Sequence, residues 1–538
     1  MTGPKAVTAA ELAGWLTDGD ELALLDAREQ GSFSEAHLFH AASLPLSHLE
    51  LLLDRLVPRR STRLVWCDGA SELARRAADR SIELGWTDVW VLSGGIESWA
   101  RAGYELYSGI NVPSKAFGEL VETTFGTPHI SATELQRLLD DGSPVVVLDS
   151  RPMGEFRRQS IPTGIDCPGA ELVYRVKEVV TDPDTTVVVN CAGRTRSIIG
   201  AQSLINAGLE NRVLALENGT MGWQLAGFEP ASGDETHAPD PGPEAAAWSS
   251  SAARRVAERF GVVEIDRATL DEWSADEHRT TYLLDVRTDA EFEAGHLPGS
   301  VHAPGGQLVQ ATDEYVATRN ARLVLVDDNG VRATMTASWL RQLGWSDAVV
   351  LAGGIGGPNV TGALAKGKVA RNDLARVTAP MMRPPELATR LDADADSIAV
   401  VDIGTSTKYQ NRGHIPGSWW GIRSRLGDAR ITIGEKPTIV LTSTDGTLAK
   451  LAVAEVAALW PHAEVFALAA GNKGWRHAGY EMEQGPGRPT TIADDVWYKP
   501  YDHDADVARQ RMQEYLTWEV ALVAQVARDP TVSFPSFG

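Results

Sequence analysis

Four stretches of this chain repeat one order of sequence signals in one register. Each has an apolar run that ends in an aspartate, and these aspartates are Asp26, Asp149, Asp285 and Asp402. A second apolar run follows, and the loop after it begins 41 or 42 residues downstream of the aspartate, at Cys67, Cys191, Asp327 and Ser443. A further 27 or 28 residues on, each stretch reaches a glycine-containing turn. Four segments kept in step over this distance indicate four copies of one structural unit.

Each unit alternates short apolar runs with stretches of helical periodicity. Runs such as Leu22–Asp26 and Val145–Asp149 are rich in Val and Leu, which is typical of strands buried in a parallel sheet. We therefore predict an α/β protein of four tandem domains, each a parallel-sheet core flanked by helices. Ligands of such sheets bind at the carboxyl ends of the strands, so the loop after the second run is the expected site.

The repeat also predicts where the domains and their connectors lie. Two connectors contain helical stretches, Pro113–Phe125 and Ala245–Phe260, and the tail contains a third, Asp504–Arg528. The apolar residues of this last stretch predict a helix that packs across domains or between subunits. The predicted segments are domain 1 (residues 1–108), a helical linker (109–127), domain 2 (128–231), a linker with a helix (232–261), domain 3 (262–358), a linker (359–380), domain 4 (381–485) and a C-terminal helical extension (486–538).

The loop of domain 2 is the strongest candidate for chemistry. A cysteine at a strand end, on a tight loop that opens a helix, meets inward-facing backbone N–H groups and the positive end of the helix. Two arginines in the loop add full charges. All these features favour the thiolate, which is the nucleophilic form of cysteine, and would hold an anion that the cysteine carries. The predicted site is Cys191 as nucleophile and, around the substrate, Ala192, Gly193, Arg194, Thr195, Arg196 and Ser197.

The corresponding loops of the other domains lack part of this equipment. Domain 1 has Cys67, but Asp68 and Glu72 follow it, and their carboxylates disfavour a thiolate and repel an anionic donor. Cys67 is therefore only a secondary candidate. The loop of domain 3 starts at Asp327 and that of domain 4 at Ser443. Both lack the thiol, so both domains are predicted to be inactive.

Two further motifs recur in domains whose loop has no cysteine. The first is an Asp–x–Arg pair that begins at Asp26, Asp149 and Asp285. We interpret it as a structural ion pair that ties the strand end to neighbouring backbone. The second is a histidine, at His37, His296 and His414. Domain 2 has Ser160 in that place, so this histidine is not the general base for Cys191.

Composition excludes several classes of partner. The chain has 50 Lys and Arg against 72 Asp and Glu, a net charge of −22, which disfavours binding to nucleic acid and to anionic membrane surfaces. No apolar run approaches the ~18 residues of a spanning helix, and the first ten residues lack a secretory signal. Three cysteines are too few for a disulfide framework, and Cys167 is expected in the core. We expect a cytoplasmic protein without metal or cofactor, and the C-terminal helix suits a homodimer.

Together these motifs resemble those of the rhodanese family of sulfurtransferases. The matching elements are the Asp–x–Arg pair, the His-(Leu/Ile)-Pro-Gly turn at residues 296–299 and 414–417, the six-residue cysteine loop, and a glycine turn followed by tryptophan, as at Trp99. The resemblance covers nearly the whole chain as four rhodanese-like domains and looks most like the multidomain thiosulfate sulfurtransferases. In many single-domain members a glycine stands three residues after the cysteine. Here Gly193 stands two after it, which leaves the donor preference open.

The resemblance implies a ping-pong sulfurtransferase. The Cys191 thiolate would attack the outer sulfur of thiosulfate, or of a related persulfide donor, expel sulfite and hold the sulfur as a persulfide. Loop N–H groups and arginine charge would stabilise that anion. A small-molecule acceptor, either cyanide or a thiol, would then remove the sulfur. Thiosulfate, glutathione persulfide and 3-mercaptopyruvate all remain candidate donors.

Two other functions compete with this interpretation. The first is a phosphatase or arsenate reductase built on the same fold; those enzymes have a Cys-x5-Arg loop, which is one residue longer. Here Arg196 stands five residues after Cys191, and the sixth residue is Ser197. The shorter loop favours a single sulfur atom over a phosphoryl group. The second alternative is a non-catalytic scaffold or redox sensor, in which Cys191 reports redox state, because three of the four loops are altered.

Overall fold

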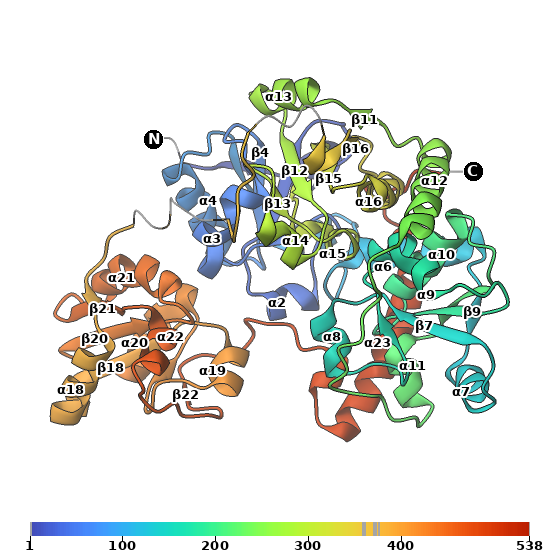
Figure 1. Cartoon of the computed structure of the whole chain (residues 1–538). Helices are drawn as coiled ribbons and strands as arrows, with labels where there is room; N and C mark the ends of the chain where they lie inside the picture. Colours follow the sequence, from blue (N-terminus) through green and yellow to red (C-terminus); the bar gives the residue numbers. More distant parts are fainter. Residues whose placement is uncertain (1–2, 358–361, 370–373, 375–376, 537–538) are drawn as a thin grey trace.

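The computed structural model describes residues 3–357, 362–369, 374 and 377–536, and it contains a sheet in each of the four predicted domains (Figure 1). The strands of domain 1 are β1 (Lys5–Val7), β2 (Leu22–Asp26), β3 (Ala42–Ser43), β4 (Arg63–Cys67) and β5 (Val89–Leu92). Its helices are α1 (Ala9–Trp15), α2 (Gln30–Glu35), α3 (Leu49–Leu56), α4 (Leu73–Glu83) and α5 (Gly95–Arg101).

The linker helix α6 (Val112–Phe125) leads into domain 2. The strands of domain 2 are β6 (His129–Ile130), β7 (Val145–Asp149), β8 (Ile165–Asp166), β9 (Thr186–Asn190) and β10 (Val213–Leu216). Its helices are α7 (Ala132–Asp140), α8 (Met153–Arg158), α9 (Glu171–Val179), α10 (Thr195–Asn206) and α11 (Gly219–Leu225). A second linker helix, α12 (Pro243–Phe260), leads into domain 3.

Domains 3 and 4 repeat this sequence of elements. Domain 3 contains β11 (Glu264–Ile265), α13 (Arg267–Ala275), β12 (Thr281–Asp285), α14 (Asp289–Ala294), β13 (Val301–His302), α15 (Gly305–Gln310), β14 (Thr318–Arg319), β15 (Arg322–Val326), α16 (Val331–Gln342) and β16 (Ala348–Leu351). Domain 4 contains β17 (Met381–Met382), α18 (Pro384–Asp394), β18 (Ile398–Asp402), α19 (Ser406–Arg412), β19 (Trp419–Trp420), α20 (Leu426–Ile433), β20 (Thr438–Thr442), α21 (Thr447–Leu459), β21 (Glu464–Leu468) and α22 (Gly471–His477). The tail adds β22 (Arg488–Pro489) and α23 (Ala505–Val526).

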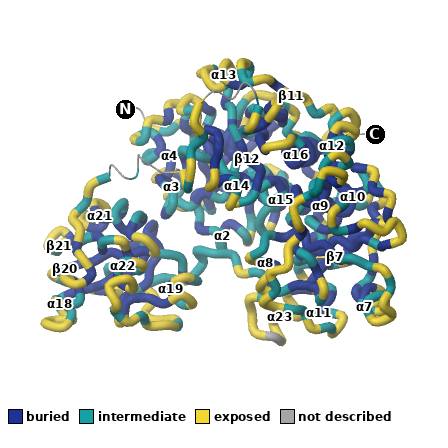
Figure 2. Tube along the Cα trace, in the orientation of Figure 1, coloured by how far each residue is buried: buried dark blue, intermediate teal, exposed yellow. Residues whose placement is uncertain are grey.

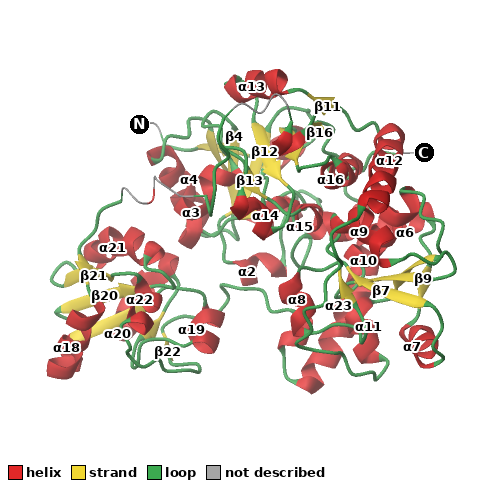
Figure 3. Cartoon of the chain, in the orientation of Figure 1, coloured by secondary structure: helices red, strands yellow, loops and turns green. Residues whose placement is uncertain are grey.

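The four sheets share one strand order. In domain 2 it is β6-β10-β9-β7-β8, with all pairs parallel, and the other domains repeat it. Helices pack around each sheet (Figure 3), so both faces of the central strands are covered. Val187, Val188 and Val189 of β9 are accordingly buried, which explains their unbroken apolar run. The predicted α/β architecture of four parallel-sheet domains is confirmed.

Domains 2 and 3 share one hydrophobic core. Helices α9 and α10 of domain 2 contact α16 and α15 of domain 3, and α12 packs on both α9 and α16. Leu172, Val256 and Trp339, from α9, α12 and α16, belong to a single buried cluster. The indole Nε1 of Trp339 donates a 2.7 Å hydrogen bond to Ser203 Oγ of domain 2. Buried segments of both domains adjoin these helices in Figure 2. This packing fixes domain 3 against the loops of domain 2.

Domain 3 also extends the sheet of domain 1. Its strand β14 pairs antiparallel with β2, with Thr318 opposite Ala23 and Arg319 opposite Leu22. The backbone N–H of Thr280 donates a 2.6 Å hydrogen bond to Glu21 beside this pairing. Along β2, β14 pairs with the residues that precede the β3 pairing, so this edge of the sheet carries partners from two domains.

Domain 4 joins domain 1 through ion pairs and through the tail. Arg423 donates a 2.8 Å hydrogen bond to Glu50 of domain 1, and both side chains are nearly buried. Asp494, in the tail, accepts hydrogen bonds from Arg425 at 2.6 Å and from Ser32 of domain 1 at 2.6 Å. The predicted end of domain 4, at residue 485, lies just before β22, which pairs with β19 of the same sheet.

The C-terminal helix α23 packs along α6 and contacts α11 of domain 2 (Figure 1). Leu516 and Leu522 are buried on it, and Gln525 donates a 2.8 Å hydrogen bond to the backbone of Leu106 in domain 1. It therefore packs across domains, one of the two arrangements that the sequence left open. Among the described residues, no helix is long and apolar enough to cross a membrane.

Candidate active site

The loop of domain 2 lies where the sheet topology places a ligand site. Strand β9 ends at Asn190, Cys191 follows directly, and α10 begins at Thr195. Asn190 lies opposite Asp149, the last residue of β7, so the loop stands at the carboxyl edge of both strands. The backbone N–H and hydroxyl of Thr220 donate hydrogen bonds of 2.8 and 3.1 Å to the carbonyl of Cys191. The cysteine backbone is thus held from the neighbouring turn.

Cys191 is buried, with 2% of its surface exposed. Burial raises the pKa of its thiol, whereas the charge of Arg196 and hydrogen bonds from the side chain and backbone of Ser197 lower it. Its Sγ lies 3.5 Å from Ser197 Oγ. The sequence predicted groups that favour the thiolate, and the structure adds a desolvation that opposes them. The thiolate therefore depends on Arg196 and Ser197.

Arg196 is the arginine whose charge acts on Cys191. Its Nη2 donates a 2.9 Å hydrogen bond to Glu155, and its Nη1 donates one of 3.3 Å to the same carboxylate. Nη1 also donates a 3.2 Å hydrogen bond to the side-chain oxygen of Gln307, on α15 of domain 3. One carboxylate and one neutral amide hold this guanidinium, so a second domain helps to position the cation of the candidate site.

Arg194 has different partners. Its Nε and Nη2 donate hydrogen bonds of 2.6 and 2.8 Å to Glu119, and Nη2 donates one of 2.5 Å to Glu122, both on α6. Its Nη1 donates a 3.3 Å hydrogen bond to Asn218. Two carboxylates offset the one guanidinium charge. The structure therefore brings Arg196 to the cysteine and uses Arg194 to fasten the loop to the linker helix.

Helix α23 supplies site residues that the sequence analysis missed. Glu519 accepts hydrogen bonds at one oxygen, Oε1, from the hydroxyl of Thr195 at 3.0 Å and from the hydroxyl of Tyr515 at 3.2 Å. On a helix, Glu519 follows Leu516 by three positions and Met512 by seven, so it shares their buried face. A carboxylate on an otherwise apolar face is the signal that could have identified it.

Gly193 lies directly against α23. A Cβ atom at this position would come within 3.0 Å of Met221 Cε, 3.2 Å of Glu519 Oε2 and 3.4 Å of Tyr515 Cε1. Contacts below about 3.4 Å demand that neighbouring atoms move. The glycine two residues after Cys191, which the sequence left unexplained, is thus accounted for by the packing of the C-terminal helix over the loop.

The sheet register corrects the position of Cys67. Cys67 is the last residue of β4 and lies opposite Asp26, just as Asn190 lies opposite Asp149 in domain 2. Asp68 therefore occupies the first position of this loop. The sequence analysis aligned the loops on their cysteines, and an interval of 41 rather than 42 residues concealed the one-residue difference.

The surroundings of Cys67 oppose a thiolate. Burial raises the pKa of its thiol well above the usual range, and the charge of Asp26 adds to this effect. Asp68 accepts hydrogen bonds from the backbone N–H of Ala74 at 3.0 Å and from the hydroxyl of Ser71 at 2.7 Å. The loop of domain 1 thus binds its own carboxylate.

The loop of domain 3 is filled in the same way. Asp327 accepts hydrogen bonds from the backbone N–H groups of Asn329, Gly330 and Ala333, at 3.2, 2.6 and 3.0 Å. In domain 4, Ser443 Oγ accepts a weaker one, of 3.3 Å, from the N–H of Ala449. The backbone donors that surround the first loop position are therefore satisfied by that residue's own side chain.

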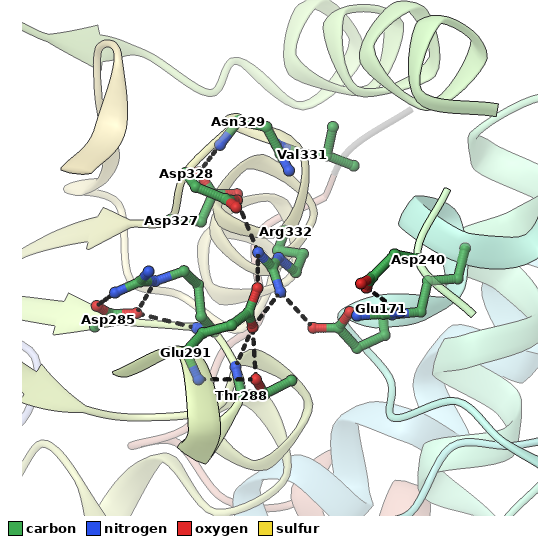
Figure 4. A network of polar contacts seen from close by, with 12 residues as sticks. Glu171, Asp240, Asp285, Thr288, Glu291, Asp327, Asp328, Asn329, Val331 and Arg332 are labelled. Atoms are coloured by element: carbon green, nitrogen blue, oxygen red, sulfur yellow. Dashed lines mark hydrogen bonds and ion pairs between the residues drawn. The ribbon is translucent and has the colours of Figure 1, made fainter. Parts of the chain in front are cut away.

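Arg332 of domain 3 stands where domain 2 has Arg196, and carboxylates surround it (Figure 4). Its guanidinium is fully buried. It donates hydrogen bonds to both oxygens of Glu291 at 2.8 and 3.0 Å, to Asp328 at 2.7 Å and to Glu171 of domain 2 at 3.0 Å. Three carboxylates on one arginine leave no positive charge for the loop.

The Asp–x–Arg pairs are structural, as predicted. Arg151 donates to both oxygens of Asp149 at 2.8 Å and, at 2.5 Å, to the carbonyl of Gln159. Domains 1 and 3 contain the same bridge, from Arg28 to Ala36 and from Arg287 to Gly295. The pair ties the strand end to backbone beyond the next helix.

The recurring histidines are structural as well. Each stacks on an aromatic ring of its own domain, with centroids 3.9 Å apart for His37, 3.8 Å for His296 and 3.7 Å for His414. Cys167 lies in the core that domains 2 and 3 share, as predicted. Within the described part of the chain, no group of three or more His, Cys, Asp or Glu could hold a metal ion.

Comparison with known proteins places these observations in a family context. The family described as rhodanese-like domain matches residues 8–102, 131–226 and 266–357, within domains 1 to 3. The crystal structure of a thiosulfate sulfurtransferase from Pseudomonas aeruginosa is 45% identical and superposes with a TM-score of 0.94. The match covers 99% of this chain and 100% of that chain. The likeness thus includes domain 4 and the C-terminal helix.

Two more distant structures are also similar. An anaerobic ergothioneine biosynthesis enzyme from Chlorobium limicola is 15% identical, with 68% of this chain and 100% of that chain covered and a TM-score of 0.24. The BH2092 protein from Bacillus halodurans is 18% identical, with 20% and 80% covered and a TM-score of 0.19. Among curated protein sequences, none matches this chain.

Proposed function

Because this chain belongs to the rhodanese family, we propose that it is a thiosulfate sulfurtransferase that carries a sulfane sulfur on Cys191. The relative that matches it from end to end is a thiosulfate sulfurtransferase. Its substrates are then a small-molecule sulfur donor and a small-molecule acceptor.

The observation that carries the proposal is the combination of residues in one loop. Domain 2 has a cysteine at the first loop position; burial raises the pKa of its thiol above the usual value, and Arg196 and Ser197 oppose this effect. The same position holds Asp68, Asp327 or Ser443 in the other domains. Sulfur transfer of this kind needs a thiolate and a cradle for an anionic sulfur, and this loop supports both.

In the first half of the reaction, the Cys191 thiolate attacks the outer sulfur of thiosulfate. A bond forms between the two sulfurs, the sulfur–sulfur bond of thiosulfate breaks, and sulfite leaves with the electron pair. Cys191 then carries a persulfide whose terminal sulfur is anionic. We assign its stabilisation to the N–H groups at the start of α10 and to Arg196, since both already lie around the thiol.

In the second half, an acceptor attacks the terminal sulfur and Cys191 leaves as a thiolate. Cyanide would yield thiocyanate, and a thiol would yield a persulfide. Donor and acceptor react in turn at one sulfur atom, so the kinetics should be ping-pong.

We propose that domains 1, 3 and 4 serve domain 2 structurally. Domain 3 supports this role most directly, since its Gln307 holds Arg196. The domain boundaries, a cytoplasmic location and a homodimer stay predictions from the sequence.

Intact-mass spectrometry after incubation with thiosulfate tests the proposal. The wild type and Cys67→Ser should each gain one sulfur atom, and cyanide should restore the original mass with release of thiocyanate. Cys191→Ser should gain nothing. A wild type that never gains sulfur would rule out the proposed activity and bring the phosphatase and scaffold alternatives forward.

A further inference from the structure

Helix α23 holds a buried carboxylate over the active-site loop. Glu519 has 1% of its surface exposed, and its Oε2 lies 3.2 Å from the position a Cβ atom of Gly193 would take. Its Oε1 is bound by the hydroxyls of Thr195, the first residue of α10, and Tyr515. The carboxylate is therefore fixed to the start of α10, four residues beyond Cys191, and lies against Gly193.

The second oxygen of this carboxylate is unsatisfied. Glu519 Oε2 is buried and has no hydrogen-bond partner among the residues that the structure describes. Buried polar atoms are nearly always hydrogen-bonded, so an orphaned acceptor against a reactive loop calls for a donor that arrives with a substrate. A thiol S–H is such a donor, whereas thiosulfate and cyanide anions are not.

A buried cation faces the same carboxylate. The ammonium of Lys115, on α6, donates a 2.6 Å hydrogen bond to the carbonyl of Ile110 and lies 5.1 Å from the ring of Tyr515. Burial raises the pKa of Glu519, and the charge of Lys115 lowers it. The ionisable groups that face Glu519 are Lys115 and Glu119 from α6, Arg194 and Cys191 from the loop, and Tyr515 from α23.

We propose that Glu519 accepts the proton of a thiol acceptor in the second half of the reaction, which makes a thiol the substrate class that discharges the Cys191 persulfide. The inference rests on the sulfurtransferase function proposed above. It adds a catalytic base that lies outside the rhodanese-like domains, on the C-terminal extension.

The thiol hydrogen-bonds to Glu519 Oε2 and gives up its proton there as its sulfur attacks the terminal sulfur of the persulfide. A new sulfur–sulfur bond forms to the acceptor, the bond to Cys191 breaks, and Cys191 leaves as a thiolate with the electron pair. The acceptor departs as a persulfide anion, and Glu519 later returns its proton to solvent. No other reactant is required.

Attack on thiosulfate needs no proton acceptor once Cys191 is ionised. The charge of Glu519 in fact raises the pKa of the Cys191 thiol, so an ionised carboxylate here works against the first half of the reaction. The two halves should therefore respond in opposite directions when this charge is removed.

The experiment compares Glu519→Gln with wild type in each half-reaction of the full-length protein. Persulfide loading by thiosulfate is followed by intact mass, and discharge is followed with glutathione or with sulfite. Sulfite at about pH 8 is largely unprotonated and serves as an acceptor that needs no base. Glu514→Gln, on the exposed side of the same helix, is the matched control.

We expect Glu519→Gln to load at the wild-type rate or faster and to discharge to sulfite normally. Its discharge to glutathione should fall about 100-fold. In the wild type the discharge rate should rise with pH as Glu519 loses its proton, and this rise should be absent from the variant. The proposal would be overturned if the variant, relative to wild type, discharged to glutathione and to sulfite with the same change in rate. It would also be overturned if loading by thiosulfate fell by as much as discharge. A wild type that does not load would instead contradict the sulfurtransferase function.

Should Glu519→Gln fail to fold, Tyr515→Phe provides the test. It removes the hydroxyl that donates to Glu519 Oε1 and retains the ring. A carboxylate with one donor fewer binds its proton more tightly, so glutathione discharge should shift to higher pH while sulfite discharge does not. An unchanged profile for glutathione would contradict the assignment.

Discussion

The loops of domains 2 and 3 stand at the same place in the same fold and differ in what their backbone donors hold. In domain 3, three N–H groups bind the carboxylate of Asp327. In domain 2, the backbone and side chain of Ser197 hydrogen-bond to the sulfur of Cys191. A cradle that binds its own side chain has no donors left for a substrate anion. If Cys191 is the nucleophile, as we propose, an aspartate at this position fills the site with its own carboxylate as well as removing the nucleophile.

Arg196 of domain 2 and Arg332 of domain 3 also differ in how far neighbouring carboxylates offset their charge. Arg196 and Arg332 both reach across the interface between domains 2 and 3. Arg196 contacts Gln307 and Arg332 contacts Glu171, and each partner stands 22 positions after the aspartate that ends a strand of its own domain. The interface is thus reciprocal, but one contact is neutral and the other charged. Arg196 keeps its charge for the thiol, whereas Arg332 gives its charge to three carboxylates. The difference teaches that the partner domain and the loop itself together set how much charge a loop arginine retains, since Arg332 is also bound by Asp328 of its own loop.

Removing the charge of Arg196 should abolish most of this contrast. Arg196→Gln leaves only the hydrogen bonds of Ser197 to oppose the effect of burial on Cys191, so the pKa of the thiol rises and the loading curve moves to higher pH. At neutral pH we expect loading by thiosulfate to slow about 10- to 100-fold, since one pKa unit is a tenfold change in thiolate. Mass spectrometry over a pH series measures this.

Arg194→Gln is the control within the same loop. Glu119 and Glu122 already offset the charge of Arg194, so the pH dependence of loading should stay in place. A shift as large as that of Arg196→Gln would show that both arginines serve the thiol, against the geometry described here.

A single substitution should make the contact of Arg196 with domain 3 resemble the charged contact of Arg332 with domain 2. Gln307→Glu gives Arg196 a second carboxylate, like that of Arg332, and should slow loading by about 3- to 10-fold at neutral pH. The reciprocal variant, Glu171→Gln, relieves Arg332 and should leave the loading rate unchanged. Stopped reactions analysed by intact mass would compare the two, and equal effects would argue against charge as the cause.

A cysteine in domain 3 should not restore activity. In a Cys191→Ser background, Asp327→Cys places a thiol at the first position of that loop, but Arg332 stays neutralised by Glu171, Glu291 and Asp328. We expect no sulfur gain with thiosulfate. A measurable persulfide on this cysteine would mean that the thiol alone separates the two domains.

Replacement of Cys67 should have the smallest effect. Cys67→Ala removes a strand residue whose thiol pKa is raised well above normal, so loading and discharge should stay within about twofold of wild type. Steady-state thiocyanate formation checks this. A clear loss of activity would assign domain 1 a role in sulfur transfer.

Local sequence patterns were enough to predict the fold and the loop of the candidate site in domain 2. Continuous apolar runs gave the sheets, and the Asp–x–Arg pairs and stacked histidines followed from their recurrence in loops without cysteine. Cys191 could be predicted as the nucleophile because strand, loop and helix are adjacent in sequence, and this role stays a proposal. The register of Cys67 was missed, since a spacing of 41 or 42 residues does not distinguish the end of a strand from the start of a loop.

The missed contacts all join residues far apart in the chain. Glu519 lies 324 positions from Thr195, and Gln307 lies 111 from Arg196. Such contacts depend on how finished domains pack, and hydrophobic periodicity describes only which face of each element is buried. A polar residue on that face is visible in the sequence, but its partner is not.

The pairing of β14 with β2 has a consequence for how this chain can be divided. Thr318 and Arg319 pair with Ala23 and Leu22, respectively, across nearly 300 residues, so a fragment that ends after domain 1 would lose this partner. Bare strand edges recruit other chains, and such a fragment should self-associate. Removing domain 3 would therefore uncover an edge of domain 1 as well as the hydrophobic core that domain 3 shares with domain 2.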